Sequence, residues 1–273
     1  MQEHAALDSV FAANRAAGRI ALSVAAHGGA TRRRRVYEDG SLRVRFPNSG
    51  ARALEAVIVN TAGGIAGGDR HDLDIGVGKG AALAVTTAAA EKVYRALGPE
   101  AEIAVKLAVG EAARLCWLPQ ETILFDRARL SRRIEVELAA DASLLLAEAV
   151  VFGRSAMGEA VSEGAFGDCW RVRRDGRLVF AESVRLQGAI EPMLAEPAVA
   201  GGGVAIATVL AVPGDEAIAT RVRAQTFCGE VAVSAWNGVA VARLVAKDGA
   251  SLRRDLIAVI VAMGGTLPRL WLN

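Results

Sequence analysis

The sequence predicts a mainly β protein whose strands stack in repeated units, with two short helices in the C-terminal third. Three observations lead to this prediction. Apolar residues alternate with polar ones in short segments along most of the chain, which is typical of strands with one buried face. Three of these segments recur at a near-constant spacing, each followed by a turn and a second apolar strand. Helical spacing of apolar residues occurs convincingly in only two segments, both near the C-terminus.

At the N-terminus, residues 1–18 are expected to form a weakly ordered leader, followed by a single domain over residues 19–273. No segment is rich enough in Pro, Gly or Ser to divide that domain, and Gly201–Gly203 is interpreted as a loop. The block Arg32–Arg35 is interpreted as a solvated strand edge, and the alternative is a docking patch for an acidic partner.

The central part of the chain contains the repeat. Alternating strands begin at Leu73, Ile103 and Ile134, which are 30 and 31 residues apart. Each is followed by a turn, assigned to Gly80, Gly110 and Asp141, and then by a second apolar strand. A repeat of this length indicates β-units that bury their apolar faces against one another.

The later elements follow from turn and capping signals. Asp175-Gly176 and Asn237-Gly238 each predict a β-hairpin, because these dipeptides favour the positive φ angles of tight hairpin turns. A short helix is predicted to open at Gly214-Asp-Glu and to carry Ile218 and Val222. A longer helix is predicted with Ser251 as its cap, and its apolar positions are Leu252, Leu256, Val259, Ile260 and Met263.

Composition excludes several functional classes. The chain has 273 residues, of which 52% are hydrophobic, and a formal net charge of +2, which argues against a nucleic-acid partner that binds through a strong basic field. No apolar run reaches the length of a transmembrane helix, so no membrane association is expected. The three cysteines are far apart and match no zinc spacing, which suits a reduced, cytoplasmic protein.

Four carboxylates occupy positions where a soluble domain usually places apolar residues. Glu148 alternates in phase with Leu146 and Val150, and Glu182 alternates in phase with Leu178 and Phe180. Glu55 precedes the apolar run 56–59, and Asp69 leads into the strand that starts the repeat. An unpaired buried carboxylate is very costly, so each must be paired, protonated, hydrated or bound to a cation. These positions are therefore the first candidates for the functional site.

The segment Asp69–Asp74 is the densest polar cluster. On a strand, Asp69 and His71 share the side of Leu73, whereas Asp72 and Asp74 share the other side with Arg70. Carboxylates with an imidazole suit a divalent cation such as nickel or zinc. The alternative is that Arg70 neutralises Asp72 or Asp74 on a solvated face. We favour that alternative for Asp72 and leave both open for Asp69 and Asp74.

Other motifs favour structural interpretations. The glycine pairs in residues 60–69 precede a strand instead of a helix, so the phosphate-binding interpretation is rejected. A hydrolytic triad is not expected, because only three histidines are present and no Gly-x-Ser-x-Gly elbow occurs. Glu121 either bonds the backbone of its turn or joins the internal carboxylates.

Specific motifs resemble the UreD (UreH) family of urease accessory proteins from about residue 18 onward. They are the glycine pairs with Asp69, the segment from Leu83 to Arg95 with its Thr-Thr and Lys-Val-Tyr-Arg, Trp117 to Phe125 with Pro-Gln-Glu-Thr, Leu144 to Arg154 with Met157 to Glu159, and Leu267 to Trp271. The resemblance implies a β-helix-like stack of strands with two helices and a maturation factor without catalytic activity. It implies association with UreF and UreG, docking on apo-urease, and help in passing nickel to the active site through an internal tunnel.

By position, the resemblance assigns acidic tunnel or metal-linked roles to Asp69, Asp74, Glu148 and Glu182, with Glu55 as a weaker assignment. Nickel would bind only in transit, and no permanent cofactor is expected. Cys116 stands where the family often has an acidic or polar residue, and we interpret it as a packing residue because a thiolate would hold nickel too tightly.

Two alternative functions compete with nickel passage. The chain could be a pure interaction scaffold whose internal acids only form structural hydrogen bonds. It could also be a β-helical carbohydrate-active enzyme that uses paired carboxylates. The aromatic content of 5% and the lack of an evident aromatic-lined sugar groove in the sequence argue against that enzyme.

Overall fold

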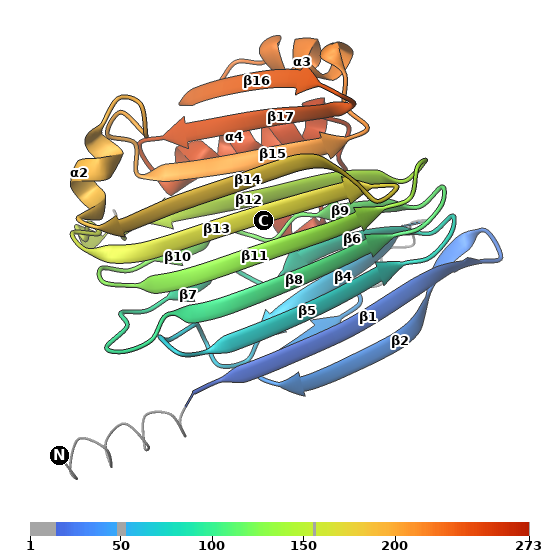
Figure 1. The fold of residues 1–273 in the computed structure, drawn as a ribbon, viewed down its shortest axis with the longest axis horizontal. Coiled ribbons are helices and arrows are strands. Elements are labelled where there is room, and N and C mark those ends of the chain that lie inside the picture. The colour runs from blue at the N-terminus through green and yellow to red at the C-terminus, as the bar shows by residue number, and fades with distance from the viewer. Residues whose placement is uncertain (1–14, 48–52, 155–156, 273) are drawn as a thin grey trace.

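Two β-sheets packed face to face form the body of the protein, as the computed structural model describes it for residues 15–47, 53–154 and 157–272 (Figure 1). Sheet A consists of β1 (Ala17–His27), β2 (Ala30–Gly40), β5 (Arg70–Val77), β8 (Ala101–Val109), β11 (Arg129–Leu138), β13 (Gly164–Arg174) and β14 (Arg177–Gly188). Their spatial order is β14-β13-β11-β8-β5-β1-β2, so β14 and β2 form the two edges.

The second sheet, sheet B, stacks behind the first. It consists of β3 (Leu42–Arg45), β4 (Leu54–Asn60), β6 (Ala82–Thr87), β7 (Glu91–Val93), β9 (Arg114–Trp117), β10 (Thr122–Leu124), β12 (Ser143–Phe152), β15 (Ala205–Val212), β16 (Glu230–Trp236) and β17 (Val239–Ala246). Its main order is β16-β17-β15-β12-β9-β6-β4-β3, and β10 pairs with both β12 and β7.

The predicted repeat is present as stacked, parallel units. Strands β5, β8 and β11 lie side by side in sheet A, and each leads through a turn into β6, β9 or β12 of sheet B. The residues at which the three strands were predicted to begin are not all paired with one another, because Leu73 pairs with Val105, which in turn pairs with Ile134. A shift of two residues keeps the same side chains inside, so an alternating pattern cannot distinguish the two registers.

Apolar side chains fill three layers. The largest core lies between the sheets, a second lies between sheet B and the C-terminal helices, and a third lies at the end that contains β7 and β10. Much of sheet B is therefore buried on both faces. In sheet A, buried apolar residues alternate along the strands with polar residues exposed on the outer face. The mainly β, stacked fold predicted from the sequence is confirmed.

Three α-helices occur in the described residues: α2 (Ile190–Ala195), α3 (Glu216–Arg223) and α4 (Gly249–Ala262), together with the 3₁₀ turn η2 (Arg269–Trp271). The two predicted helices are α3 and α4, but the prediction missed α2, whose six residues are too few to show a helical period. The cap of α4 is Asp248 and not Ser251, since the Asp248 carboxylate accepts the Ser251 backbone amide at 2.8 Å. None of the described helices combines the length and apolarity needed to cross a bilayer.

Both predicted hairpins are present. β13 and β14 join through Asp175-Gly176, and β16 and β17 join through Asn237-Gly238, with positive φ at all four residues. One detail is wrong: Leu178 was expected to point inward with Glu182, but it is 53% exposed. An irregularity in the β13–β14 pairing, where Val172 faces Phe180 and Arg173 faces Leu178, reverses the side-chain direction before Phe180.

At the N-terminus, residues 1–14 of the predicted leader lie outside the described residues, and Ala17 and Gly18 already belong to β1. At the other end, the segment after α4 packs against sheet B. The indole of Trp271 donates a hydrogen bond to the Leu118 carbonyl at 3.0 Å and another to the Thr86 hydroxyl at 3.1 Å. This anchor joins the C-terminal segment to β6 and to the loop after β9.

Replacing Asp248 by Ala is expected to lower the free energy of unfolding by about 1 kcal/mol, because α4 loses the side chain that caps its first turn. Urea denaturation followed by circular dichroism measures the change. The Ser251→Ala variant is the control, since it keeps the cap carboxylate and the Ser251 amide. A larger loss in Ser251→Ala than in Asp248→Ala would contradict the assignment of the cap.

Candidate functional site

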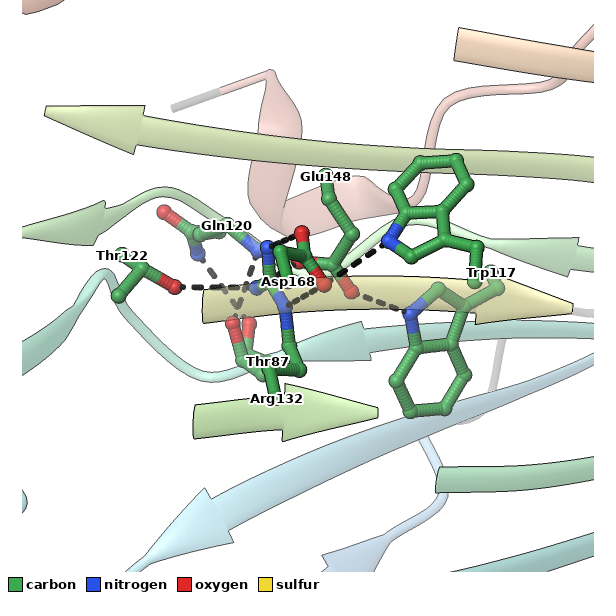
Figure 2. Close-up of polar contacts among 8 residues, drawn as sticks. Thr87, Trp117, Gln120, Thr122, Arg132, Glu148 and Asp168 are labelled. Atoms are coloured by element: carbon green, nitrogen blue, oxygen red, sulfur yellow. Dashed lines mark hydrogen bonds and ion pairs between the residues drawn. The ribbon is translucent and has the colours of Figure 1, made fainter. Parts of the chain in front are cut away.

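A buried ion cluster lies between the two sheets. Arg132 on β11 contacts Asp168 on β13, with Nε 3.1 Å from Oδ1 and Nη2 2.5 Å from Oδ2, and its Nη1 donates to Oε2 of Glu148 on β12 (Figure 2). The side chains of Arg132 and Glu148 are each only 4% exposed. The cluster therefore joins sheet A to sheet B through a charged interaction inside an apolar sandwich.

Two tryptophans complete the hydrogen bonds of the cluster. The Trp117 indole donates to Glu148 Oε1 at 2.8 Å, and the Trp170 indole donates to Asp168 Oδ1 at 2.9 Å. Every oxygen of the two carboxylates thus accepts a hydrogen bond within the cluster, which is the arrangement that lets buried charges persist. With one arginine and two acids, the cluster has a net negative charge when both acids are ionised.

Burial and the neighbouring charges act in opposite directions on these groups. Burial raises the pKa of Glu148 to about 7, against the lowering effect of Arg132, and Asp168 adds to the rise. Burial would lower the pKa of Arg132, but Asp168 and Glu148 raise it above its usual value, so the guanidinium remains charged. The cluster is consequently sensitive to any change that removes one of its members.

Small pockets adjoin the cluster on both sides. One of about 60 Å³ is lined by His71, Glu91, Arg132 and Glu148 among others. Another of about 30 Å³ is lined by Arg132, Glu148, Asp168 and Glu182 among others. One water molecule needs roughly 10–15 Å³ of pocket volume, so the larger pocket has room for a few waters and the smaller pocket for about two.

The larger pocket contains two titratable groups besides the cluster. Burial raises the pKa of Glu91 to about 7, against the hydrogen bond that the Asn60 amide donates to its carboxylate at 3.1 Å. Burial also lowers the pKa of His71, although Asp69 and Asp72 oppose this shift, so the ring is neutral at pH 7. Its Nε2 lies 3.3 Å from the Ser41 hydroxyl. The Glu91 carboxyl can offer an oxygen ligand, and the neutral His71 ring a nitrogen ligand, to a cation in the pocket.

Glu182 lines the smaller pocket on β14, an edge strand of sheet A. Its Oε2 accepts a hydrogen bond from Arg243 of β17 at 2.8 Å, and its Oε1 is 3.3 Å from the Thr208 hydroxyl. Burial raises the pKa of Glu182, and the ion pair with Arg243 opposes that rise. The Arg243 side chain is 57% exposed, so this pair is much closer to solvent than the central cluster.

The predicted residues at positions 69 and 74 lie apart from the cluster. Asp69 is buried, but its carboxylate accepts backbone amides from Ala16 and Ala66, both at 2.8 Å, and so holds the loop before β5. Asp74 is exposed on the outer face of sheet A, as strand alternation predicts. Asp74 cannot take part in a site between the sheets.

Glu55 and Glu121 lie on the opposite face of sheet B from Glu148. Glu55 is buried near the C-terminal segment, 3.5 Å from the Arg269 amide, and its Oε1 has no hydrogen-bond partner among the described residues. Glu121 does neither of the things expected of it, because both of its oxygens accept hydrogen bonds from Arg253 of α4, at 3.0 and 3.1 Å. The two acids therefore belong to the contact between sheet B and the C-terminal segments.

Cys116 also faces this second layer. It belongs to the core between sheet B and the helices, and burial raises the pKa of its thiol. A neutral thiol packed among apolar side chains supports the interpretation of Cys116 as a packing residue.

The structure brings together only Glu148 and Glu182 of the five predicted metal residues, on either side of the smaller pocket. In the ranges that the structure describes, no group of three or more His, Cys, Asp or Glu side chains could hold a metal ion. Sequence reasoning missed Arg132, Asp168 and Glu91. A signal existed for Arg132 and Asp168, because each alternates in phase with apolar residues, Leu130 with Ile134 and Phe166 with Trp170.

Comparison with known proteins gives consistent matches over nearly the whole chain. The family model described as UreD urease accessory protein matches residues 16–272. A urease accessory protein UreD of Rhodopseudomonas palustris (strain BisB18) is 59% identical over 268 residues, covering 97% of both chains. A protein of the same name from Bradyrhizobium diazoefficiens is 58% identical over 267 residues, covering 97% of both chains. A urease accessory protein UreD 1 of Bradyrhizobium sp. (strain ORS 278) is 54% identical over 267 residues, covering 97% of this chain and 96% of the relative.

The Arg132→Met variant is expected to lose about 3–5 kcal/mol of unfolding free energy, because two buried carboxylates lose their common partner. Chemical denaturation of the variant at pH 7 measures the loss. The triple variant Arg132→Met, Glu148→Gln, Asp168→Asn removes all three charges and should be more stable than Arg132→Met alone. A loss below about 1 kcal/mol in Arg132→Met would show that the cluster is not held by charge.

The contribution of Glu91 to stability is expected to fall as the pH rises from about 4.5 to about 7. Its folded-state pKa of about 7 lies above the usual value of 4.5, so in this range the unfolded state releases a proton that the folded state keeps, and above pH 7 the loss is complete. The Glu91→Gln variant should therefore be stabilised relative to the parent at pH 8, by up to about 3 kcal/mol, and little changed at pH 5. Unfolding free energies at several pH values give the comparison, and an equal effect of the substitution at pH 5 and pH 8 would contradict the shift.

Proposed function

We propose that the protein is a urease maturation factor and not an enzyme, because this chain belongs to the UreD family of urease accessory proteins. We propose further that it works with UreF and UreG, docks on apo-urease in the cytoplasm, and assists the delivery of nickel to the urease active site. The three cysteines, all free thiols, support the cytoplasmic location.

The observation that supports nickel passage is the line of acids inside the sandwich. Glu91 lines the larger pocket, Glu148 lines both pockets, and Glu182 lines the smaller one. Carboxylate oxygens bind nickel weakly compared with thiolate or imidazole. Weak sites in series suit an ion that must leave each site as readily as it enters.

The central cluster limits how an ion could pass. Arg132 and Glu148 line both pockets, and the guanidinium repels a cation while it contacts Glu148. Passage therefore requires Arg132 to move away from Glu148, so that the carboxylate is free to meet the ion. Asp168 can keep the guanidinium during that movement, since it holds two of the three guanidinium nitrogens. The same residues could in this way stabilise the closed sandwich and admit the ion.

The ion pairs also favour a second candidate, a pure scaffold for urease assembly. Both Glu148 and Glu182 have arginine partners, and Asp69 caps backbone amides. In this case the acids only stabilise the fold, and the protein acts by orienting apo-urease and the other accessory proteins. The two candidates predict different levels of urease maturation for a variant that lacks the acids but has regained its stability.

Replacing Glu148 or Glu182 by Gln is expected to lower the nickel content and the activity of urease matured with the variant, because each change removes a carboxylate from the route. Urease is matured in cells that express the variant, and its nickel is measured by atomic absorption. Asp69→Asn tests the remaining inward-facing acid of the predicted set. Asp74→Asn is the matched control, since it removes the same charge from the exposed face of β5.

A compensated variant separates passage from scaffolding. Removing Arg132 alone leaves Glu148 and Asp168 without their common partner, and the triple variant Arg132→Met, Glu148→Gln, Asp168→Asn is expected to recover part of the stability lost in Arg132→Met. If nickel uses Glu148, the triple variant still fails to mature urease even at a temperature where it is fully folded. Full recovery of maturation together with stability would refute passage and support the scaffold.

A further inference from the structure

The outer face of sheet A contains a hollow with a floor of small residues. Strand pairing places Arg129 beside Ala165 and Gln187, Ser131 beside Gly167 and Arg185, and Arg133 beside Cys169 and Ser183, in three rows across β11, β13 and β14. Gly167 is the centre of this grid, and a side chain there would meet no atom closer than 4.0 Å. The small residues around the glycine leave a hollow of about 740 Å³.

Three arginines surround this hollow, which we call the arginine bay, defined by Arg129, Arg133, Arg185 and Gly167. Along β11, Arg129 and Arg133 are four residues apart, or about 13 Å, and Arg185 stands two strands away, or about 10 Å. All three are exposed on the same face. An arginine side chain is long enough for the three guanidinium groups to reach an anion held above Gly167.

The arginines of the bay have few partners of their own. Arg185 donates to the amide oxygen of Gln187 at 2.9 Å, whereas Arg129 and Arg133 have no hydrogen-bond or ion-pair partner in the part of the chain that the structure describes. Other arginines on this face are paired, as Arg70 is with Glu102 at 2.8 Å and Arg173 with Glu137 at 3.5 Å. Arg129 and Arg133 therefore keep guanidinium donors that Arg70 and Arg173 use in ion pairs.

The local charge is positive, although acids lie at the rim. Glu100 and Glu102 both line the hollow, but Glu102 is neutralised by Arg70. Asp168 also lines the hollow, but it is paired with Arg132, so three arginines face one acid without an arginine partner, Glu100, on a chain whose overall charge is only +2. Two hydroxyls, of Ser131 and Ser183, add neutral donors to the floor.

A second hollow of about 230 Å³ continues the bay past the start of β11. It shares Arg129, Ala165 and Gln187 with the bay, and it adds Arg127 together with Glu163, its ion-pair partner at 4.0 Å. The two adjoining hollows reach across β11, β13 and β14, which suits an extended chain with several acidic groups better than a single small anion. Arginine forks match carboxylates with two hydrogen bonds each.

We propose that the arginine bay binds an extended acidic segment of a protein partner during urease assembly, so that carboxylates of the partner meet Arg129, Arg133 and Arg185 above Gly167. The choice of a protein partner rests on the proposed function. The surface itself is argued from strand register, exposure and unpaired charge. Because the contact is formed by exposed charges, it acts mainly on the rate of association and weakens as salt increases.

The test compares two charge-matched triple variants of the full chain. The bay variant combines Arg129→Gln, Arg133→Gln and Arg185→Gln. The control variant combines Arg45→Gln, Arg173→Gln and Arg223→Gln, which removes three arginines that are already ion-paired elsewhere. Binding is measured to immobilised apo-urease, with and without the other accessory proteins, and to a fluorescent oligoglutamate peptide with oligoglutamine as its neutral counterpart.

The bay variant is expected to bind the glutamate peptide and the partner at least roughly tenfold more weakly, whereas the control changes little. A third variant, Gly167→Leu, should weaken binding by filling the hollow without changing the charge. Equal binding by the bay variant and the parent chain would overturn the proposal while leaving the maturation role intact. Displacement of the peptide by inorganic phosphate at constant ionic strength would also overturn it, in favour of a small-anion site.

The same set of proteins separates this proposal from the proposed function. A parent chain that binds the peptide through the bay but does not support urease maturation would count against the maturation role only. A parent chain that matures urease, and a bay variant that matures it equally well with unchanged partner binding, would count against the bay only.

Discussion

The guanidinium of Arg132 bonds Asp168 within sheet A and Glu148 of sheet B, and the arrangement of the interior depends on this shared charge. Apolar side chains alone would let the sheets slide by a full residue pair with little loss of burial, since the alternating pattern repeats. A buried arginine with two acids and two indoles has only one satisfied arrangement. The cluster therefore fixes which part of β11 lies opposite which part of β12, and the flanking pockets are a result of that fixed position.

This constraint changes how the internal acids should be understood. Buried carboxylates in an apolar layer suggest either a route for a cation or a structural network, and here one residue, Glu148, belongs to both descriptions. Glu182 differs, because the side chain of its arginine partner is 57% exposed and can move into solvent. An ion would thus meet its main barrier at Arg132 and not at the side of the sandwich. Whether the protein carries nickel or only arranges partners depends on how easily that one guanidinium moves.

The fold was predictable because the signals for it are local. Alternation, Asp-Gly and Asn-Gly turns, and two helical patterns identify the strands, hairpins and α3 and α4. The register of the repeat was not predictable, since shifts of two residues leave the same faces buried. Strand phase correctly placed Glu148 and Glu182 between the sheets but could not reveal their arginine partners, which lie 16 and 61 residues away in the chain. Strand phase could not tell on which side of sheet B Glu55 lies, because this sheet is buried on both faces and burial alone does not distinguish them.

The anchor formed by Trp271 has a consequence for how the protein is made. Its indole bonds Thr86, which was synthesised 185 residues earlier, and Glu55 is covered by a segment that follows it by more than 200 residues. Pairing over such distances is slow to form, and a chain still on the ribosome exposes the uncovered back of sheet B to solvent. During that interval the apolar strands β6 and β9 are open to aggregation. Co-expression with chaperones or slow induction at low temperature should therefore matter more for obtaining this protein than its final stability would suggest.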